Sequence, residues 1–168
     1  MNIFYLDSNP KLAAEYHLDK HVIKMILESA QLLCTAHIII DKVSSAEKNL
    51  YHLTHINHPC SVWARTSINN YMWLYNLFTS LCDEYMFRYE KMHKTDVRFR
   101  HVLKTPPVNM LNVEFTSPAQ AMPIKYKNSD SILAYRNYYI NEKYKFASWK
   151  KRETPFWFKS VGENYANV

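Results

Sequence analysis

Along most of the chain, apolar residues recur at the three- and four-residue spacing of an α-helix, and Pro, Asn and Asp stand where these runs begin. The pattern predicts a first helix over about 11–40, a second over about 59–94 and a third over about 131–149. The segments 41–53 and 96–118 are polar or interrupted by Pro, which favours loops. The sequence therefore predicts three main helices joined by long loops.

Glycine is nearly absent from the chain, and this narrows the fold class. Gly162 is the single glycine among 168 residues, so Gly-rich phosphate loops and dinucleotide-binding turns are excluded. Hairpins and bulges also depend on glycine, which argues against an all-β protein. With 48% hydrophobic and 15% aromatic residues, the chain can bury a core without disulfides. We expect one compact all-α domain over residues 1–168, with an aromatic C-terminal tail at Thr154–Phe158.

Charge and cysteine content indicate a partner and a compartment. The chain has 21 Lys and Arg against 15 Asp and Glu, and this net charge of +6 favours an anionic partner, nucleic acid first. Its 3 cysteines include no Cys-x-x-Cys pair, which is typical of buried thiols in a reducing compartment. We find no apolar run of membrane-spanning length and no signal-peptide pattern, so we expect a cytoplasmic protein without a membrane partner.

The sharpest chemical signal is a narrow polar stripe along the first predicted helix. At 100° per residue, the stripe is about 80° wide. Its members are His17, His21, Lys24, Glu28, Gln31 and Thr35. The rest of the circumference is mostly apolar, so the helix should be buried, with the stripe lining a cleft or pairing internally. The alternative is an ordinary solvent face. We favour the cleft, because this set of side chains is typical of an active site.

Two members of the stripe carry the candidate chemistry. Glu28 is its one carboxylate and would act as a general base or stabilise a cationic sugar. Lys24, one turn away, would act as an amine nucleophile if desolvated, although the two side chains could instead form a simple salt bridge. The further candidates on this helix are His17 and His21, which would orient phosphate or base, and Lys20 and Gln31, which would bind substrate.

A second candidate segment lies at the start of the second predicted helix. It brings His55 and His58 to a helix N-terminus, where free N–H groups favour anions. Arg65 and Asn70 follow, with aromatic residues between them, and such a mixture suits phosphates and stacked bases. We expect these four residues to hold phosphate. The aromatic residues of the segment, Trp63, Tyr71 and Trp73, are more simply explained as core.

A metal site is the alternative use of these histidines. The spacing of His17 and His21 suits a pair of ligands on a helix, and His55, His58 and Cys60 could complete a site. No compact Cys and His cluster exists in the sequence, however, and the lysine of the stripe would repel a cation. We therefore expect no metal and no other cofactor.

Four segments share motifs with one enzyme family. The ending Thr154–Gly162 contains Pro, Trp, an aromatic, Lys and Gly in the register of a Pro-x-Trp-Tyr-Lys-Tyr-Tyr-Gly ending. The segments Met122–Lys127 and Asn141–Lys143 match two shorter stretches, and Ala13–Leu18 matches a Leu-Ala-Asp-Gln-His-Leu stretch on a first helix. The chain thus resembles the phage pyrimidine-dimer DNA glycosylases, the endonuclease V family, over about two thirds of its length.

The resemblance implies an all-α fold, DNA binding on a basic face, and cleavage of a base–sugar bond through a Schiff base followed by strand scission. The family's nucleophile is the α-amine of a small residue exposed by removal of the initiator Met, and its acid/base is a Glu on the first helix, flanked by Arg. His17, Trp157 and Lys159 correspond directly, and the resemblance implies that Trp157 stacks on the substrate and Lys159 binds it.

The chain departs from the family pattern at the catalytic positions. Counting from the shared histidine, Lys24 stands where the family has its Glu, and Ile23 and Leu27 stand at the Arg positions. Asn2 is too large for efficient removal of the initiator, so the free amine would belong to Met1. Either a neighbouring carboxylate has taken the acid/base role, or the chemistry has changed.

These observations together predict an enzyme that cleaves the N-glycosidic bond of a nucleotide in DNA, with an AP-lyase step, or of a nucleotide-like small molecule. The alternative from another class is a non-catalytic protein that binds DNA or sequesters a nucleotide. A metal-dependent hydrolase is the third reading.

Overall fold

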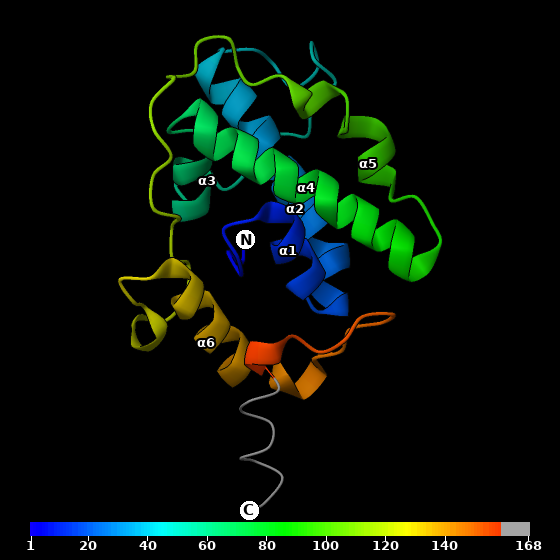
Figure 1. The fold of residues 1–168 in the computed structure, drawn as a ribbon. Helices are drawn as coiled ribbons and strands as arrows, with labels where there is room; N and C mark the ends of the chain where they lie inside the picture. Colours follow the sequence, from blue (N-terminus) through cyan, green and yellow to red (C-terminus); the bar gives the residue numbers. More distant parts are fainter. Residues whose placement is uncertain (159–168) are drawn as a thin grey trace, which may run out of the picture.

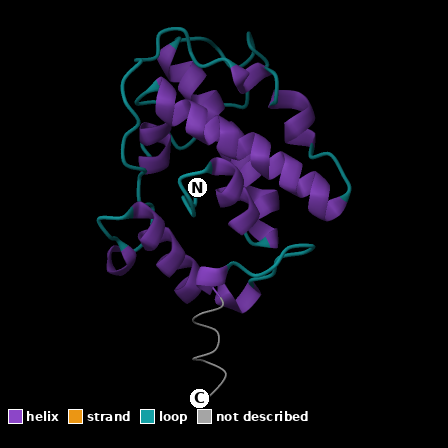
Figure 2. Ribbon diagram, in the orientation of Figure 1, coloured by secondary structure: helices purple, strands orange, loops and turns teal. Residues whose placement is uncertain are grey.

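Two helices of 22 residues, α2 (Asp19–Ile40) and α4 (Ile68–Tyr89), pack against each other at the centre of the fold (Figure 1). The computed structural model describes residues 1–158. Within these residues Figure 2 shows helices joined by loops, without a strand, so the predicted compact all-α fold is confirmed. The other elements are α1 (Pro10–Tyr16), α3 (Pro59–Ala64), α5 (Lys94–Phe99), η1 (Val102–Lys104), η2 (Ile124–Tyr126), α6 (Ser131–Lys143) and η3 (Tyr144–Phe146).

The first predicted helix is divided, so a single helix over 11–40 is wrong. His17 and Leu18 have extended backbones, with ψ of 130° and 157°, and they separate α1 from α2. The guanidinium of Arg88 on α4 donates to the carbonyl oxygens of Glu15 at 3.0 Å and His17 at 2.9 Å. These carbonyls lie at the end of α1, and Arg88 satisfies them where the helical ladder stops.

The other two predicted helices also have different bounds. The run 59–94 is divided at residues 65–67, because Ser67 caps α4 by accepting a hydrogen bond from the Asn70 N–H at 3.1 Å. The third helix begins after Asp130, whose side chain caps it as expected, but it ends at Lys143 and continues as the 3₁₀ turn η3.

The first residues of the chain are part of the core. Ile3 and Leu6 are completely buried, and the two aromatic residues between them are nearly so. Asn2 folds this segment: its Oδ1 accepts from the N–H groups of Ile3 at 2.8 Å and Phe4 at 3.2 Å, and its Nδ2 donates to the Ala121 carbonyl at 2.9 Å. Figure 1 marks the N-terminus near the middle of the molecule. The position of the first residue is therefore fixed by the fold.

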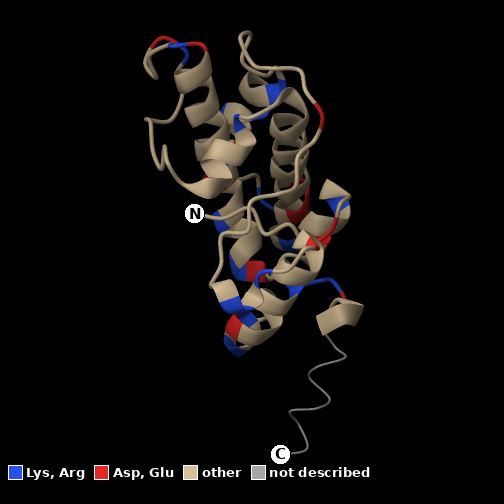
Figure 3. Ribbon diagram, turned by 90° about the vertical axis from the view of Figure 1, so that its left-hand side faces the viewer, with Lys and Arg blue, Asp and Glu red and all other residues tan. Residues whose placement is uncertain are grey.

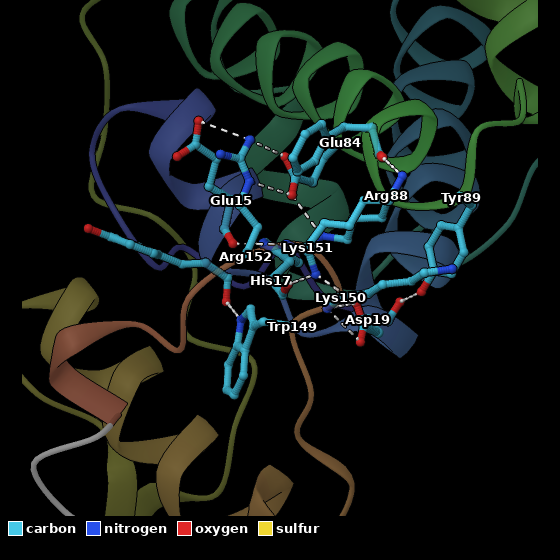
Figure 4. A network of polar contacts seen from close by, with 12 residues as sticks. Glu15, His17, Asp19, Glu84, Arg88, Tyr89, Trp149, Lys150, Lys151 and Arg152 are labelled. Carbon is cyan, nitrogen blue, oxygen red and sulfur yellow. Dashed lines mark hydrogen bonds and ion pairs between the residues drawn. The ribbon is translucent and has the colours of Figure 1, made fainter.

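A buried ionic network joins three distant parts of the chain (Figure 4). Arg88 is completely buried and donates to Glu84 Oε1 at 2.7 Å and Asp19 Oδ1 at 2.9 Å. Arg152 donates to Glu84 Oε2 at 2.9 Å, and the Lys150 N–H donates to Asp19. Burial disfavours the charge on Glu84, but the two guanidinium groups outweigh it and lower the pKa of this carboxyl. The network holds the α1–α2 junction against α4 and residues 149–152.

One helix of the described residues, α2, is long and apolar enough by composition to cross a membrane, in contrast to the expectation from the sequence. Its most apolar 18-residue window has a mean hydropathy of 1.5, and 61% of that window is buried inside the protein. The same burial is found for the central helix of a globular domain.

Candidate functional site

Glu28 faces the start of the chain. Its Oε2 accepts a hydrogen bond from the Asn2 main-chain N–H at 2.9 Å and lies 3.7 Å from the α-amino nitrogen of Met1. The carboxylate side chain is 10% exposed. The fold creates this contact by burying residues 3–6 beneath α2, which leaves the first two residues beside the third turn of that helix. The result is a carboxylate and an amine side by side.

The amine of Met1 is the accessible part of that residue. The Met1 side chain is 2% exposed, whereas the residue as a whole is partly exposed, so its exposed area belongs to the main chain and its amino group. An amine in this position can reach a molecule that approaches from solvent. At the same time, the buried side chain prevents the amine from moving away from Glu28.

Lys24 completes a group of two amines around one carboxylate. Its Nζ lies 3.3 Å from Glu28 Oε1, the i,i+4 contact expected from the sequence. The Lys24 side chain is 65% exposed, however, so it lacks the burial that activates lysine nucleophiles. The exposed Lys24 ammonium group can instead attract anions toward Met1 and Glu28.

Two histidines of the second candidate segment lie near this group. His58 Nδ1 accepts from the Cys60 N–H at 3.2 Å, which caps α3, and its ring contacts that of His55 with centroids 6.3 Å apart. Burial is the main cause of a lowered His58 pKa, and the charges of the Met1 amine, His55 and Glu28 also act on it. His58 therefore lies within electrostatic reach of Met1 and Glu28, and His55 lies beside His58.

His17 and His21 have a different environment. His21 stacks on Phe4 with centroids 4.3 Å apart, and its Nδ1 lies 2.6 Å from the Tyr139 hydroxyl oxygen. His17 Nδ1 lies 2.6 Å from the Ala13 carbonyl oxygen. Burial lowers the pKa of His17 to about 4 and that of His21 to about 2, so both are neutral near pH 7. They pack in the core, and His21 lies about two helical turns before the carboxylate.

Arg65 and Asn70 also bind protein groups. Arg65 donates to the Ile56 carbonyl at 2.7 Å and to Ser61 Oγ at 3.1 Å, which holds the loop before α3. Asn70 is completely buried, and its amide bonds the Trp63 carbonyl and Thr116. These contacts explain both residues as supports of the loops beside the site, and they leave no amide atom of Asn70 for phosphate.

The remaining sequence candidates lie at the margins. Lys20 is exposed, with its Nζ 4.9 Å from the centre of the Phe146 ring, and Gln31 is half-buried. Trp157 is 8% exposed and packs against Tyr16 and Tyr139, so its ring faces the protein. Lys159 lies outside the described residues. The core assignment of Trp63, Tyr71 and Trp73 is confirmed, since all three are buried.

The described residues contain no group of three or more His, Cys, Asp or Glu arranged to hold a metal. The histidines that the spacing suggested as ligands bond Ala13 and Tyr139 instead. A surface pocket of about 170 Å³ lies elsewhere, beside the buried ionic network, and is lined by Lys11, Glu15, Ser80, Asp83, Glu84, Phe87 and Arg152. The carboxylates of Glu15 and Glu84 are already paired with Arg152.

The contribution of Asn2 to the site was missed from the sequence. A signal was present, because four successive apolar residues at 3–6 favour burial of the chain start, and Asn is a residue that forms local turns with its own backbone. Chemically, the arrangement offers an accessible amine, a mostly buried carboxylate that can exchange a proton with it, and two imidazoles nearby. No protein-family model, curated protein or solved structure matches this chain.

Proposed function

We propose that the protein cleaves the N-glycosidic bond of a nucleotide in DNA, with the α-amine of Met1 as nucleophile and Glu28 as the acid/base. The observation that carries this proposal is the distance of 3.7 Å between the Met1 nitrogen and Glu28 Oε2. The resemblance to the pyrimidine-dimer glycosylases supports it, because their chemistry uses an α-amine and a glutamate. Here Glu28, one turn beyond the family position, supplies the carboxylate.

The surroundings favour Met1 over Lys24 as the nucleophile. The Lys24 side chain is 65% exposed, so its amine stands at the end of a long side chain in solvent. The Met1 amine has less freedom, because the Met1 side chain and residues 3–6 are buried.

The reaction needs proton transfers that Glu28 is placed to make. The amine lone pair forms a bond to C1′ of the sugar, and the electron pair of the glycosidic bond leaves with the base, which takes up a proton. The amine then loses a proton to Glu28, and the C1′–O4′ bond opens as O4′ is protonated, which gives a Schiff base. Loss of a C2′ proton breaks the bond to the 3′ phosphate, and water releases the amine.

The cationic sugar formed during this reaction explains the need for a charged carboxylate. A fixed negative charge in a site of reduced water access stabilises such a cation. The Asn2 N–H holds Oε2 in place at 2.9 Å, so the carboxylate is oriented before substrate binds. Glu28→Gln keeps the shape and removes the charge, and we expect it to lower the rate by about 10³-fold, equivalent to several kcal/mol in the barrier.

The decisive experiment is borohydride trapping with DNA that contains an abasic site. Reduction of a Schiff base leaves the amine joined to the DNA, and mass spectrometry of tryptic peptides identifies the residue. We expect the adduct on the peptide that begins at Met1. We expect Glu28→Gln to form this adduct more slowly. Lys24→Met is the matched control, since it removes the other amine beside the same carboxylate and should still be trapped.

Three results would contradict the proposal. An adduct on Lys24, with loss of trapping in Lys24→Met, would assign the amine chemistry to the helix. Unchanged rates in Glu28→Gln would remove its acid/base role. Binding of the abasic DNA without any adduct or turnover would favour the alternative, a non-catalytic protein that binds DNA or sequesters a nucleotide.

A further inference from the structure

Three lysines, each above an aromatic ring, lie where the first turn of α2 meets the end of α6, beside His21 and about two helical turns before Glu28. We name this group the lysine–aromatic strip, and its members are Lys20, Lys143, Lys145, Tyr138, Tyr144 and Phe146. The distances from Nζ to ring centre are 4.9 Å for Lys20 and Phe146, 4.7 Å for Lys143 and Tyr138, and 5.9 Å for Lys145 and Tyr144. The strip combines the first turn of α2, the end of α6 and η3.

The strip continues toward the candidate site. Phe146 contacts the His21 ring with centroids 6.1 Å apart, and His21 stacks on Phe4, which follows the first residues of the chain. The positive charges of Lys143 and Lys24 both help to lower the pKa of His21, after burial and the charge of His17. Lys24 is in turn paired with Glu28. Figure 3 shows Lys and Arg positions, interleaved with Asp and Glu, in the lower part of the molecule below the start of the chain.

The ammonium groups of the strip form no close ion pair within the described residues, although the charge of Lys143 acts on the neighbouring Glu142. Over residues 1–158, no carboxylate forms an ion pair with the ammonium group of Lys20, Lys143 or Lys145, although Glu142 lies beside the strip and pairs with Lys125. Two other cations that lie over aromatic rings are neutralised: Arg136 pairs with Asp7, and Arg152 pairs with Glu84. The strip is therefore a place where excess positive charge meets aromatic surface.

The combination of lysines and rings selects among polyanions. Lysines alone attract the phosphates of duplex and single-stranded DNA alike. Aromatic rings add affinity only where a base presents its face, and in a duplex these faces are covered by neighbouring bases. Tyr144 is 57% exposed and Phe146 and Tyr138 are half-buried, so parts of the three rings reach the surface beside the ammonium groups. A bound base can take the ring face while the lysine moves to the adjacent phosphate.

We propose that the lysine–aromatic strip binds single-stranded DNA and delivers it to the amine of Met1, so that the substrate is a nucleotide in an unpaired strand. The proposal rests on the proposed function for the reaction that follows binding. Binding itself depends only on the strip, and the two can be tested separately.

The test measures fluorescence anisotropy of labelled oligothymidylate of about 12 nucleotides, and of the matching duplex, at about 50 mM salt. We expect the single strand to bind about tenfold more tightly than the duplex. Tyr144→Leu should weaken single-strand binding by about 5- to 150-fold, which is the range for loss of one base–aromatic stack, and should leave duplex binding unchanged. Phe87→Leu is the matched control: this ring is 44% exposed and lies under Lys151, which is paired with Glu90.

A salt titration tests the lysines. Replacing Lys20, Lys143 and Lys145 together by Gln removes three phosphate contacts, and the slope of log affinity against log salt should decrease by about 2. Duplex binding as tight as single-strand binding, or unchanged affinity in Tyr144→Leu with an intact circular-dichroism spectrum, would overturn the proposal. Glu28→Gln separates the strip from the proposed reaction, because this variant should bind the single strand normally while losing turnover. If the wild-type protein cleaved duplex DNA without binding the single strand, the strip alone would be refuted.

Discussion

Acid should destabilise the protein through His17, which the fold keeps neutral and completely buried. Burial is the main cause that lowers its pKa from 6.5 to about 4, and the positive charge of Arg88 adds to it, against an opposing hydrogen bond to the Ala13 carbonyl. The folded protein therefore takes up this proton only near pH 4, whereas an unfolded chain takes it up near pH 6.5. Between these values the unfolded state binds more protons, so stability falls as the pH falls.

The size of the effect follows from the two pKa values. Between about pH 7.5 and about pH 5, the difference in proton binding at His17 amounts to a loss of about 2 kcal/mol in the free energy of unfolding. A residue that does not titrate removes this contribution. We expect His17→Gln to be less stable than the wild type at pH 7.5, because the site is packed, but to lose about 2 kcal/mol less on acidification.

Urea unfolding followed by circular dichroism, at both pH values, measures these differences. The comparison uses the change with pH within each protein, so the cost of the substitution itself cancels. His101→Gln serves as the control because His101 is exposed, and its loss on acidification should equal that of the wild type. Equal losses in the wild type and His17→Gln would show that His17 accepts its proton in the folded protein, and the argument from burial would be wrong.

Two further substitutions test the fold. Arg88→Met should lower the free energy of unfolding by about 3–5 kcal/mol in urea, because it leaves Glu84 and Asp19 without their buried partner; a loss below about 1 kcal/mol would contradict this. Lys42→Gly should raise stability by about 0.5–1 kcal/mol, because Lys42 directly follows the C-cap residue of α2 and has a φ of 55°. Lys42→Ala should give no such gain, and equal effects of the two variants would refute the explanation.

Helical class could be predicted because its signals are local. Periodic apolar residues, the cap at Asp130 and the lack of glycine all act within a few residues, and the structure keeps each of them. The break at His17 and Leu18 could not be predicted in this way. Its partner is the guanidinium of Arg88, 71 residues away from His17, and nothing in the intervening spacing indicates that contact.

The same distinction holds for the candidate site. The contact of Lys24 with Glu28 is an i,i+4 pair on one helix, so the spacing predicted it. The place of Met1 depends on how residues 3–6 pack against the rest of the core, which is a tertiary property. Asn70 illustrates the opposite error: an amide that binds phosphate and one that holds Thr116, 46 residues further on, look the same in a sequence.

The buried ionic network also constrains when the protein can fold during its synthesis. Glu84 bonds both Arg88 and Arg152, and Asp19 bonds both Arg88 and the main chain of Lys150. A nascent chain that has emerged only through α4 holds Arg88 and its two acidic partners but lacks residues 149–152. The α1–α2 junction therefore remains without its outer support until residues 149–152 have left the ribosome, so it gains its full set of contacts only after α6 has emerged.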